Sequence, residues 1–326
     1  MLNSKININS NKNIKQFFNE NQLTNFIKEH IPQDASSRKY YRLNNNLLLM
    51  ESTSSENKNH EFIKVSRHLK KIGLSAPKII KVDHKKGLYL IEDFGDLTYN
   101  KAIKNNISEE LLYINAIRCL SHIHSTNPPL DFPKYDYKYL LDEVNLFIDW
   151  YFKEINIKLN NDSINNWQLS WMKIFKNLDQ NKLVLRDFHA DNLFWLPKRK
   201  EIRKVGLIDF QDALIGDEAY DISSLLEDVR RDVSEKTKSV AIREFIKLNK
   251  IKNKNKFIQN YNIFTAQRNA KIVGIFIRLA RRDNKLKYLE LVNKAMNTFL
   301  QSAKRAKLKE INEWIETHIP KNKLYL

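Results

Sequence analysis

The spacing of apolar and polar positions divides the chain into a β-rich first part and a mainly helical remainder. Apolar side chains that recur every three or four residues indicate helices, and short apolar runs between turn residues indicate strands. Before residue 97 the pattern predicts, in order, a helix over 14–30, two strands over 39–50 joined at Asn44-Asn45-Asn46, a helix over 60–73 that ends at Gly73, and two strands over 78–96 that turn at Lys86-Gly87.

After residue 96 the helical spacing dominates, over 97–127, over 137–180 and from Ala219 to the end. A short β insertion interrupts it, with the strings KLVLRDF, NLFWL and VGLIDF, and we expect the first two to form a hairpin. The sequence therefore predicts an α+β protein with a β-rich N-terminal lobe (1–95), a connector at about 91–97 and a helical C-terminal lobe (96–326). Ligands bind preferentially in clefts between such lobes.

The composition is that of a globular protein, with 42% hydrophobic residues and 17 Phe. A single cysteine, Cys119, excludes an intramolecular disulfide framework and fits a reducing compartment. The N-terminal segment is rich in Asn and Lys and lacks the apolar stretch of a signal peptide. No apolar run approaches the roughly 18 to 20 residues that span a bilayer. We expect a soluble cytoplasmic protein without a membrane partner.

The net charge of +18 raises the question of nucleic-acid binding. The lysines, however, are spread along the whole chain beside Asn and Ile, and no RRM, KH or zinc-finger spacing is present. We therefore expect no nucleic-acid partner, and the charge favours a small anionic substrate such as a nucleotide or an acidic sugar. A basic nucleic-acid-binding protein remains the alternative, which salt-sensitive binding without ATPase activity would support.

Three polar residues at the β insertion carry the predicted chemistry: Asp187, Asn192 and Asp209. Each could simply cap a turn or end a strand. Their order, Asp-x-x-x-x-Asn followed by Asp at the end of an apolar strand, favours function instead. Amide and carboxylate oxygens from Asn192 and Asp209 suit Mg²⁺. Asp187 then orients or deprotonates an attacking hydroxyl, which is the division of labour that phosphoryl transfer from ATP needs.

The segments LRDFHADNLFWL (185–196) and GLIDFQDALIGDEAYDISSLL (206–226) resemble the aminoglycoside phosphotransferase and choline kinase-like family, relatives of the protein kinases. The resemblance implies a two-lobed protein-kinase-like fold, Asp187 as the catalytic base, and Asn192 and Asp209 as Mg²⁺ ligands. It also implies that Asp221, with Asp217 in the same motif, supports the catalytic loop. The chain departs from the family pattern H-G-D-x-H-x-x-N by having Leu185 and Arg186 in place of His and Gly.

Further strings narrow the resemblance to the bacterial anomeric kinases that phosphorylate N-acetylmuramate and N-acetylglucosamine in cell-wall sugar recycling. They cover nearly the whole chain: ASSRKYYRL (35–43), LIEDFGDLTY (90–99), VNLFIDWYF (144–152), DFQDALIGDEAYDISSLLEDVRRDV (209–233) and QRNAKIVGIFIRLARRDNKLKYL (267–289). The preference between the two sugars stays open.

The predicted nucleotide-binding residues lie before residue 97. In ASSRKYYR, the small residues Ser36 and Ser37 let backbone N–H groups approach phosphate, and Arg38 or Arg42 can neutralise it. The adenine is expected at the backbone of the connector, from Glu92 to Phe94.

The strand LLLMES has no lysine at the position where kinases of this superfamily carry the one that grips the phosphates, and Glu51 stands near that position. An arginine of the first loop, Lys58 or Lys64 could substitute, and the sequence does not decide between them.

The acceptor-side residues are assigned more indirectly. His189 and Asp191 follow the base in the loop and either contact the sugar or support the loop. Asp228 and Arg231 belong to a charged cluster, Glu227 to Arg231, expected on a helix whose charged face could equally be solvated. Arg268 and Arg278 are expected on one helix. The resemblance favours binding of the acceptor carboxylate by a guanidinium, and the alternative is two solvated arginines on a basic helix.

We therefore expect an ATP- and Mg²⁺-dependent kinase for the anomeric hydroxyl of an amino sugar. The alternatives are a kinase of the same family for choline, homoserine, methylthioribose or an aminoglycoside, and a catalytically weak nucleotide-binding pseudokinase. The sequence does not give the oligomeric state or the extent of lobe closure.

Overall fold

The computed structural model describes residues 12–23, 29–31, 38–52 and 56–326. Contacts within the chain group it into two compact units. The first comprises Met1–Cys119 and Ala190–Asp212, and the second comprises Leu120–His189 and Ala213–Leu326. The first junction falls inside helix α4 (Glu109–Ser125). The lobe boundary between residues 95 and 96 stays a prediction.

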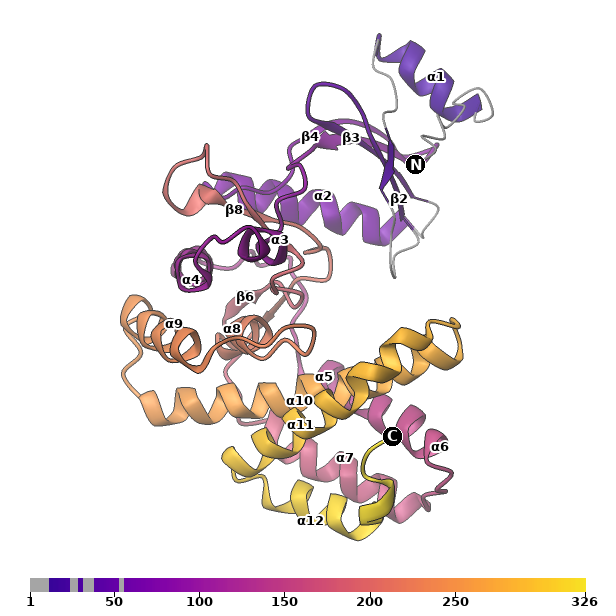
Figure 1. The fold of residues 1–326 in the computed structure, drawn as a ribbon, viewed down its shortest axis with the longest axis vertical. Helices are drawn as coiled ribbons and strands as arrows, with labels where there is room; N and C mark the ends of the chain where they lie inside the picture. Colours follow the sequence, from indigo (N-terminus) through magenta and orange to yellow (C-terminus); the bar gives the residue numbers. More distant parts are fainter. Residues whose placement is uncertain (1–11, 24–28, 32–37, 53–55) are drawn as a thin grey trace. The chain divides into compact units, whose positions relative to one another are not determined.

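The first unit is built on a five-stranded antiparallel sheet with the strand order β1-β2-β3-β5-β4. Figure 1 labels β2, β3 and β4 of this sheet. The strands are β1 (Glu29–Ile31), β2 (Arg38–Arg42), β3 (Leu47–Ser52), β4 (Ile79–Asp83) and β5 (Leu88–Glu92). The antiparallel sheet predicted for this part of the chain is confirmed, with both of its predicted strand pairs.

Two tight turns fix the register of this sheet. Between β2 and β3 the turn residues Asn45 and Asn46 are left-handed, with φ of 63° and 56°, a conformation that asparagine tolerates better than most residues. Before β5, Gly87 also has a positive φ, and a Cβ on it would lie 2.2 Å from the carbonyl oxygen of Ser52. The glycine at this turn therefore lets the two backbones approach.

The prediction of one helix over 14–30 is wrong. Helix α1 (Lys12–Glu20) ends early, because the chain reverses at Gln22, whose φ is 51°, and the described part resumes as strand β1. The apolar face of α1, formed by Ile14, Phe17 and Phe18, is buried in one cluster with side chains of the sheet such as Leu49. The apolar spacing thus predicted α1 correctly, but the predicted helix extended too far along the chain.

The first unit also contains helices α2 (Glu56–Lys71) and α3 (Tyr99–Lys104) and a small ladder of β7 (Leu193–Trp195) with β8 (Val205–Leu207). The predicted helix end at Gly73 is confirmed, with φ of 86°. Phe62 of α2 stacks on Phe210, which follows β8, with ring centroids 5.4 Å apart. The segment after β8 is thereby packed against α2.

The second unit is mainly helical, as predicted, with a small ladder of β6 (Lys182–Val184) and β9 (Leu214–Gly216). Its helices are α5 (Tyr137–Leu146), α6 (Phe152–Glu154), α7 (Asn161–Phe175), α8 (Ala219–Leu226), α9 (Glu235–Leu248), α10 (Lys254–Arg281), α11 (Val292–Arg305) and α12 (Lys309–His318). A π-helical turn, Phe147–Tyr151, links α5 to α6, and short 3₁₀ turns cover Glu201–Lys204 in the first unit and Leu286–Leu291 and Lys321–Lys323 in the second.

The expected hairpin of the first two insertion strands is wrong. β6 pairs with β9, and β7 pairs with β8, so the two strands that flank Asp187 and Asn192 belong to different ladders. β6 ends at Val184, three residues before Asp187, because backbone N–H groups of the next residues turn to a side chain of α8. The expected helix over Glu227–Arg231 is also wrong, since α8 ends at Leu226.

Helix α10 is the central element of the second unit and packs against α5, α8 and α11 (orange in Figure 1). Gly274 allows its close approach to α5, because a Cβ there would lie 2.2 Å from the carbonyl oxygen of Leu146. An aromatic cluster around Trp167, Trp171 and Phe299 fills the core between α7 and α11. Among the helices of the described residues, none is long and apolar enough to cross a membrane.

Candidate active site

The loop after β6, Leu185 to His189, carries the predicted base and is held by α8. Asp221 of α8 is fully buried and accepts hydrogen bonds from the N–H groups of Leu185 at 2.6 Å and Arg186 at 2.9 Å. Burial raises the pKa of Asp221 to about 7, against the lowering effect of these two bonds. The neighbouring Asp217 accepts from the N–H of Ala219 at 2.9 Å and from the Asn260 amide at 2.8 Å.

Arg186 has a left-handed backbone, with φ of 71°, at the position where the family pattern has glycine. This conformation costs a residue with a side chain of order 1 kcal/mol. The Arg186 carbonyl oxygen accepts a hydrogen bond from Arg268 Nη1 at 2.8 Å and one from Ser224 Oγ at 3.3 Å. The strained residue is therefore fixed at both its N–H and its C=O.

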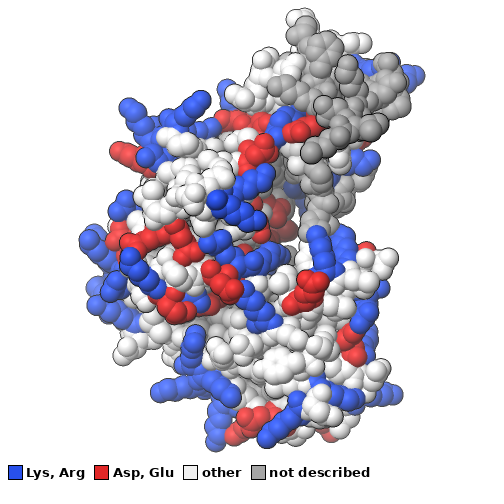
Figure 2. Space-filling view, in the orientation of Figure 1, with Lys and Arg blue, Asp and Glu red and all other residues white. Residues whose placement is uncertain are grey.

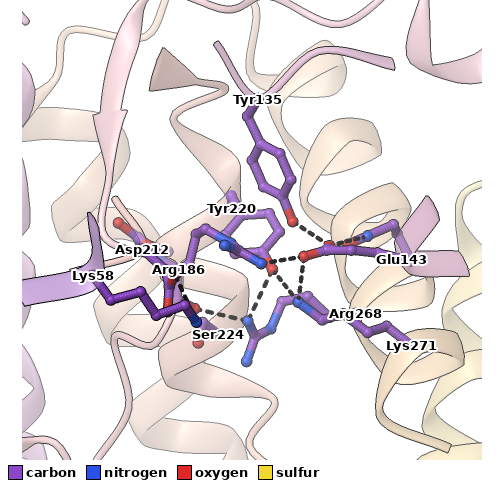
Figure 3. A network of polar contacts seen from close by, with 11 residues as sticks. Lys58, Tyr135, Glu143, Arg186, Asp212, Tyr220, Ser224, Arg268 and Lys271 are labelled. Atoms are coloured by element: carbon purple, nitrogen blue, oxygen red, sulfur yellow. Dashed lines mark hydrogen bonds and ion pairs between the residues drawn. The ribbon is translucent and has the colours of Figure 1, made fainter. Parts of the chain in front are cut away.

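The Arg186 side chain forms an ion pair with Glu143 of α5 and lies over the ring of Tyr135, 5.3 Å from its centroid (Figure 3). Glu143 also accepts hydrogen bonds from the Tyr135 hydroxyl and from Gln267 Nε2, and it pairs with Lys271 Nζ at 3.2 Å. Burial would raise the pKa of Glu143, but Lys271, Arg186 and these bonds lower it to about 2. A buried glutamate with two cationic partners, Arg186 and Lys271, thus contacts the loop that carries Asp187.

Asp187 is half-buried and its electrostatic environment is positive. Burial would raise its pKa, yet Lys271, His189, Arg268 and Arg186 together hold that pKa below its usual value. Lys271 and Arg268 both contact the hydroxyl of Tyr220, at 2.9 and 3.2 Å (Figure 3). Asp187 is therefore ionised at neutral pH and suited to accept a hydrogen bond from a hydroxyl group.

The first unit brings together the two predicted metal ligands. Asn192 Nδ2 lies 3.4 Å from Asp209 Oδ2, and the Asn192 carbonyl oxygen accepts from the N–H of Ile208 at 3.2 Å. Asp209 follows β8 in a left-handed conformation, with φ of 59°. An amide and a carboxylate side by side form a donor set that fits Mg²⁺.

Arg38, predicted at the phosphates, is buried in the first unit. It donates to Gln211 Oε1 at 3.0 Å and to the Lys58 carbonyl oxygen at 3.1 Å, while Gln211 donates to Asp209 Oδ1 at 2.9 Å. These contacts connect Arg38 to Asp209 through one glutamine. A phosphate contact of Arg38 itself stays a prediction.

Arg42 is engaged in three ion pairs, with Asp93 at 2.6 Å, Asp96 at 3.0 Å and Glu29 at 2.5 Å. Its guanidinium thus binds the beginning of the predicted connector to the sheet. Ser36 and Ser37 lie outside the described residues.

Two lysines remain candidates for the lysine that strand β3 lacks. Lys58 pairs with Asp212 at 3.5 Å and is 61% exposed in its side chain, and Lys64 pairs with Glu61 at 3.8 Å. Glu51 of β3 accepts a hydrogen bond from the Tyr41 hydroxyl. These contacts do not choose between the two lysines.

In the connector, the N–H groups of Glu92 and Asp93 donate to the carbonyl oxygens of Lys78 and Asn46. The Glu92 carboxylate pairs with Arg199, whose guanidinium lies 5.1 Å from the centroid of the Phe94 ring. The N–H groups of Glu92 and Asp93 are therefore already hydrogen-bonded within the protein. The predicted adenine contact is left with the other backbone groups of the connector.

On the acceptor side, the second unit brings His189 and Asp228 together. Both are buried, with 4.0 Å between His189 Nδ1 and Asp228 Oδ2. Asp228 Oδ1 accepts from the N–H and the guanidinium of Arg230, while Oδ2 has no hydrogen-bond partner among the described residues. A buried carboxylate oxygen of this kind suits a hydroxyl or amide donor of a ligand.

The other predicted acceptor residues have the following contacts. Asp191 accepts from the Asn100 amide in the first unit. Arg268 is buried, with a guanidinium bound to the Arg186 carbonyl and Tyr220.

Arg278 lies on the same helix as Arg268, as predicted, but ten residues, or about 15 Å, further along the helix axis. Its half-buried guanidinium has a lowered pKa, chiefly because of burial and Arg282. Arg231 is half-buried in the segment after α8.

Three residues with a direct place in these contacts were not predicted: Glu143, Lys271 and Gln211. Glu143 lies on the buried face of α5 with Leu140 and Val144, so a charged residue within an apolar stripe was the available signal. Its partners Arg186, Gln267 and Lys271 come from the loop after β6 and from α10, and their spacing in the sequence gave no indication of the pairing.

The strong positive charge is not gathered on one patch in the view of Figure 2, where Lys and Arg side chains alternate with Asp and Glu.

Comparison with known proteins gives a family. Residues 29–244 match the model of the phosphotransferase enzyme family. An N-acetylmuramate/N-acetylglucosamine kinase of Caulobacter vibrioides is 30% identical over 270 residues, which cover 79% of this chain and 74% of that protein. A kinase of the same name from Pseudomonas aeruginosa is 27% identical over 294 residues, covering 86% and 85%.

Solved structures agree in fold. The ADP-bound aminoglycoside phosphotransferase APH(2'')-Ib has a TM-score of 0.61 at 16% identity and covers 91% of this chain and 99% of its own. A choline/ethanolamine kinase family protein from Mesorhizobium loti has a TM-score of 0.62 at 12% identity, covering 87% and 92%. The chain belongs to the phosphotransferase enzyme family and has the protein-kinase-like fold of these enzymes. It is a small-molecule kinase of that family.

We expect Glu143 to contribute a pH-dependent share of stability. Its folded pKa of about 2 lies below the value of about 4.3 for an unfolded chain, so its stabilisation is complete above the unfolded pKa and is lost as the pH falls towards 2. The difference in unfolding free energy between wild type and Glu143→Gln should shrink by about 2 kcal/mol from pH 6 to pH 3 in urea titrations. Glu154→Gln, which removes a surface pair with Arg281, is the matched control. A difference that stays constant with pH would contradict the assignment.

Proposed function

We propose that this protein is an ATP- and Mg²⁺-dependent kinase that phosphorylates the anomeric hydroxyl of an amino sugar, N-acetylmuramate or N-acetylglucosamine. The observation that carries the chemistry is the ionised Asp187, held on a loop that α5, α8 and α10 fix from three sides. The choice of the two sugars rests on the relatives from Caulobacter vibrioides and Pseudomonas aeruginosa, which are named N-acetylmuramate/N-acetylglucosamine kinases. The anomeric position rests on the resemblance of the sequence strings.

In the proposed reaction, Asp187 accepts the hydrogen bond of the sugar C1 hydroxyl and orients its oxygen towards the γ-phosphorus of ATP. The new bond joins the C1 oxygen to this phosphorus while the bond to the β–γ bridging oxygen breaks and ADP leaves. The hydroxyl proton passes to Asp187 and then to solvent. Because the pKa of Asp187 is low, orientation contributes more than basicity.

Asn192 and Asp209 would hold Mg²⁺, which when bound supplies positive charge at the phosphates. Two consecutive hydrogen bonds, from Arg38 to Gln211 and from Gln211 to Asp209, orient the Asp209 carboxylate for metal binding. A metal ligand that is itself hydrogen-bonded keeps one geometry, so Gln211 belongs to the proposed metal site.

An anionic or neutral polar acceptor fits the acceptor side better than a cationic one. Lys271, Arg268 and Arg186 surround Asp187 with positive charge, which disfavours choline and aminoglycosides. Asp228 Oδ2 is placed in the proposal as the acceptor for a sugar hydroxyl or the N-acetyl N–H.

The acceptor is tested by ADP release with N-acetylmuramate, N-acetylglucosamine, choline and kanamycin. We expect turnover on at least one amino sugar and none on the two cations. The absence of turnover on both amino sugars would refute the proposed substrate and leave the family unaffected.

Asp187→Asn should lower kcat by about 10²- to 10⁴-fold because the hydroxyl loses its acceptor, while the affinity for ATP stays within about twofold. Steady-state kinetics and ATP titration measure the two effects. Asp179→Asn, which alters an exposed carboxylate paired with Lys256, is the control. An Asp187→Asn variant with wild-type kcat would refute the role of Asp187.

Thermal shift with ATP tests the metal site and the pseudokinase alternative together. We expect the shift in Tm to be larger with Mg²⁺ than with EDTA, and this difference to vanish in Asp209→Asn, because one carboxylate ligand is lost. A shift that Mg²⁺ does not change in the wild type would favour a metal-independent nucleotide-binding protein.

A further inference from the structure

Neither Glu143 nor Arg186 carries out a step of the proposed reaction, although their buried contact helps to hold the loop that carries Asp187. The contact joins α5 to the residue directly before Asp187 (Figure 3). Within the second unit, Glu143 is only 7% exposed and also binds Tyr135, Gln267 and Lys271. Its carboxylate is thus held in place by three partners besides Arg186.

Arg186 needs such a partner because its own backbone is strained. With φ of 71°, it adopts a conformation that glycine reaches freely and other residues do not. Asp221 and Arg268 fix its N–H and its C=O through the backbone alone, and any residue in the same conformation could make those two bonds. The ion pair with Glu143, like the contact with the Tyr135 ring, depends on the Arg186 side chain.

The loop turns tightly after this residue. The N–H of Asp187 donates to the Leu185 carbonyl oxygen at 2.9 Å, and the N–H of His189 donates to the Asp187 carbonyl oxygen at 3.2 Å. A rotation at Arg186 therefore carries over directly to the direction of the Asp187 side chain.

We propose that Glu143 is a positioning residue for phosphoryl transfer. It anchors the Arg186 side chain, keeps the residue left-handed, and so aims the Asp187 carboxylate at the acceptor hydroxyl. This inference rests on the proposed function for its kinetic consequence, while its structural part concerns the loop alone.

The kinetic test is a double-mutant cycle of Glu143→Gln and Arg186→Gly. Glycine adopts the left-handed backbone conformation without strain. Arg186→Gly therefore removes the ion pair with Glu143 while the left-handed conformation at position 186 stays accessible. We expect each single variant to lower kcat by about 10- to 100-fold with KM for ATP within about twofold, because a slightly misdirected base slows the chemical step. The double variant should be no slower than the slower single variant.

Tyr135→Phe is the matched control. It removes a hydrogen bond to the same Glu143 carboxylate and keeps the ring beneath Arg186. We expect it to lower Tm as a buried hydrogen bond does and to keep kcat within about threefold. A purely structural role of Glu143 would instead make kcat follow Tm in all variants, which would overturn the proposal.

Hydrogen–deuterium exchange separates this inference from the substrate assignment, because it needs no acceptor. Exchange at the amides of Asp187 and His189 should rise in Glu143→Gln and in Arg186→Gly, and stay unchanged at Leu183 in the β6–β9 ladder. Wild-type protein that turns over neither amino sugar would refute the proposed function and leave this measurement valid.

Two further results would overturn the positioning role: unchanged exchange at the loop amides in both variants, or an Arg186→Gly enzyme with wild-type kcat. Where Glu143→Gln does not fold, Arg186→Gly alone decides between these outcomes.

Discussion

A carboxylate withdrawn from water needs positive charge close to it, and in this protein that requirement shapes the whole neighbourhood of the loop after β6. Glu143, Asp187 and Asp221 lie in one region of the second unit, and Arg268 and Lys271 of α10 approach them from one side. Arg186 adds a third cation from the loop itself. Helix α10 therefore supplies two of the three Lys and Arg side chains that lower the pKa values of Glu143 and Asp187.

The element pattern of the fold could be predicted well from the sequence where local signals suffice. The Asn44–Asn46 and Lys86-Gly87 turns and the helix end at Gly73 were correct because each depends on residues that tolerate positive φ. Strand pairing could not be obtained in this way. β6 has β9 as its partner, and β9 lies after the whole β7–β8 ladder, so neighbouring strands in the sequence were paired wrongly.

In the candidate site, too, residues with a local sequence signal could be predicted, and residues that depend on long-range contacts could not. Asp187, Asn192 and Asp209 could be named because their residue types and their order along the chain indicate a metal and phosphate site and also match the family motif, and their roles remain predictions. Glu143, Lys271 and Gln211 could not, because their relevance comes from contacts between segments far apart in the chain, such as Glu143 with Lys271. Arg38 was assigned to phosphate from its charge and its place in the first loop, and Arg268 to the acceptor mainly from the resemblance. The guanidinium groups of both bind protein acceptors in this structure.

The close approach of α10 to α5 at Gly274 has a consequence for how this sequence can vary. Gly274 lies three residues after Lys271, and the Leu146 carbonyl that it faces lies three residues after Glu143. The ion pair is thus one helical turn from the point where the two backbones touch. A methyl group at position 274 would separate the helices and stretch the charge pair. We therefore expect positions 143, 146, 271 and 274 to co-vary among related sequences.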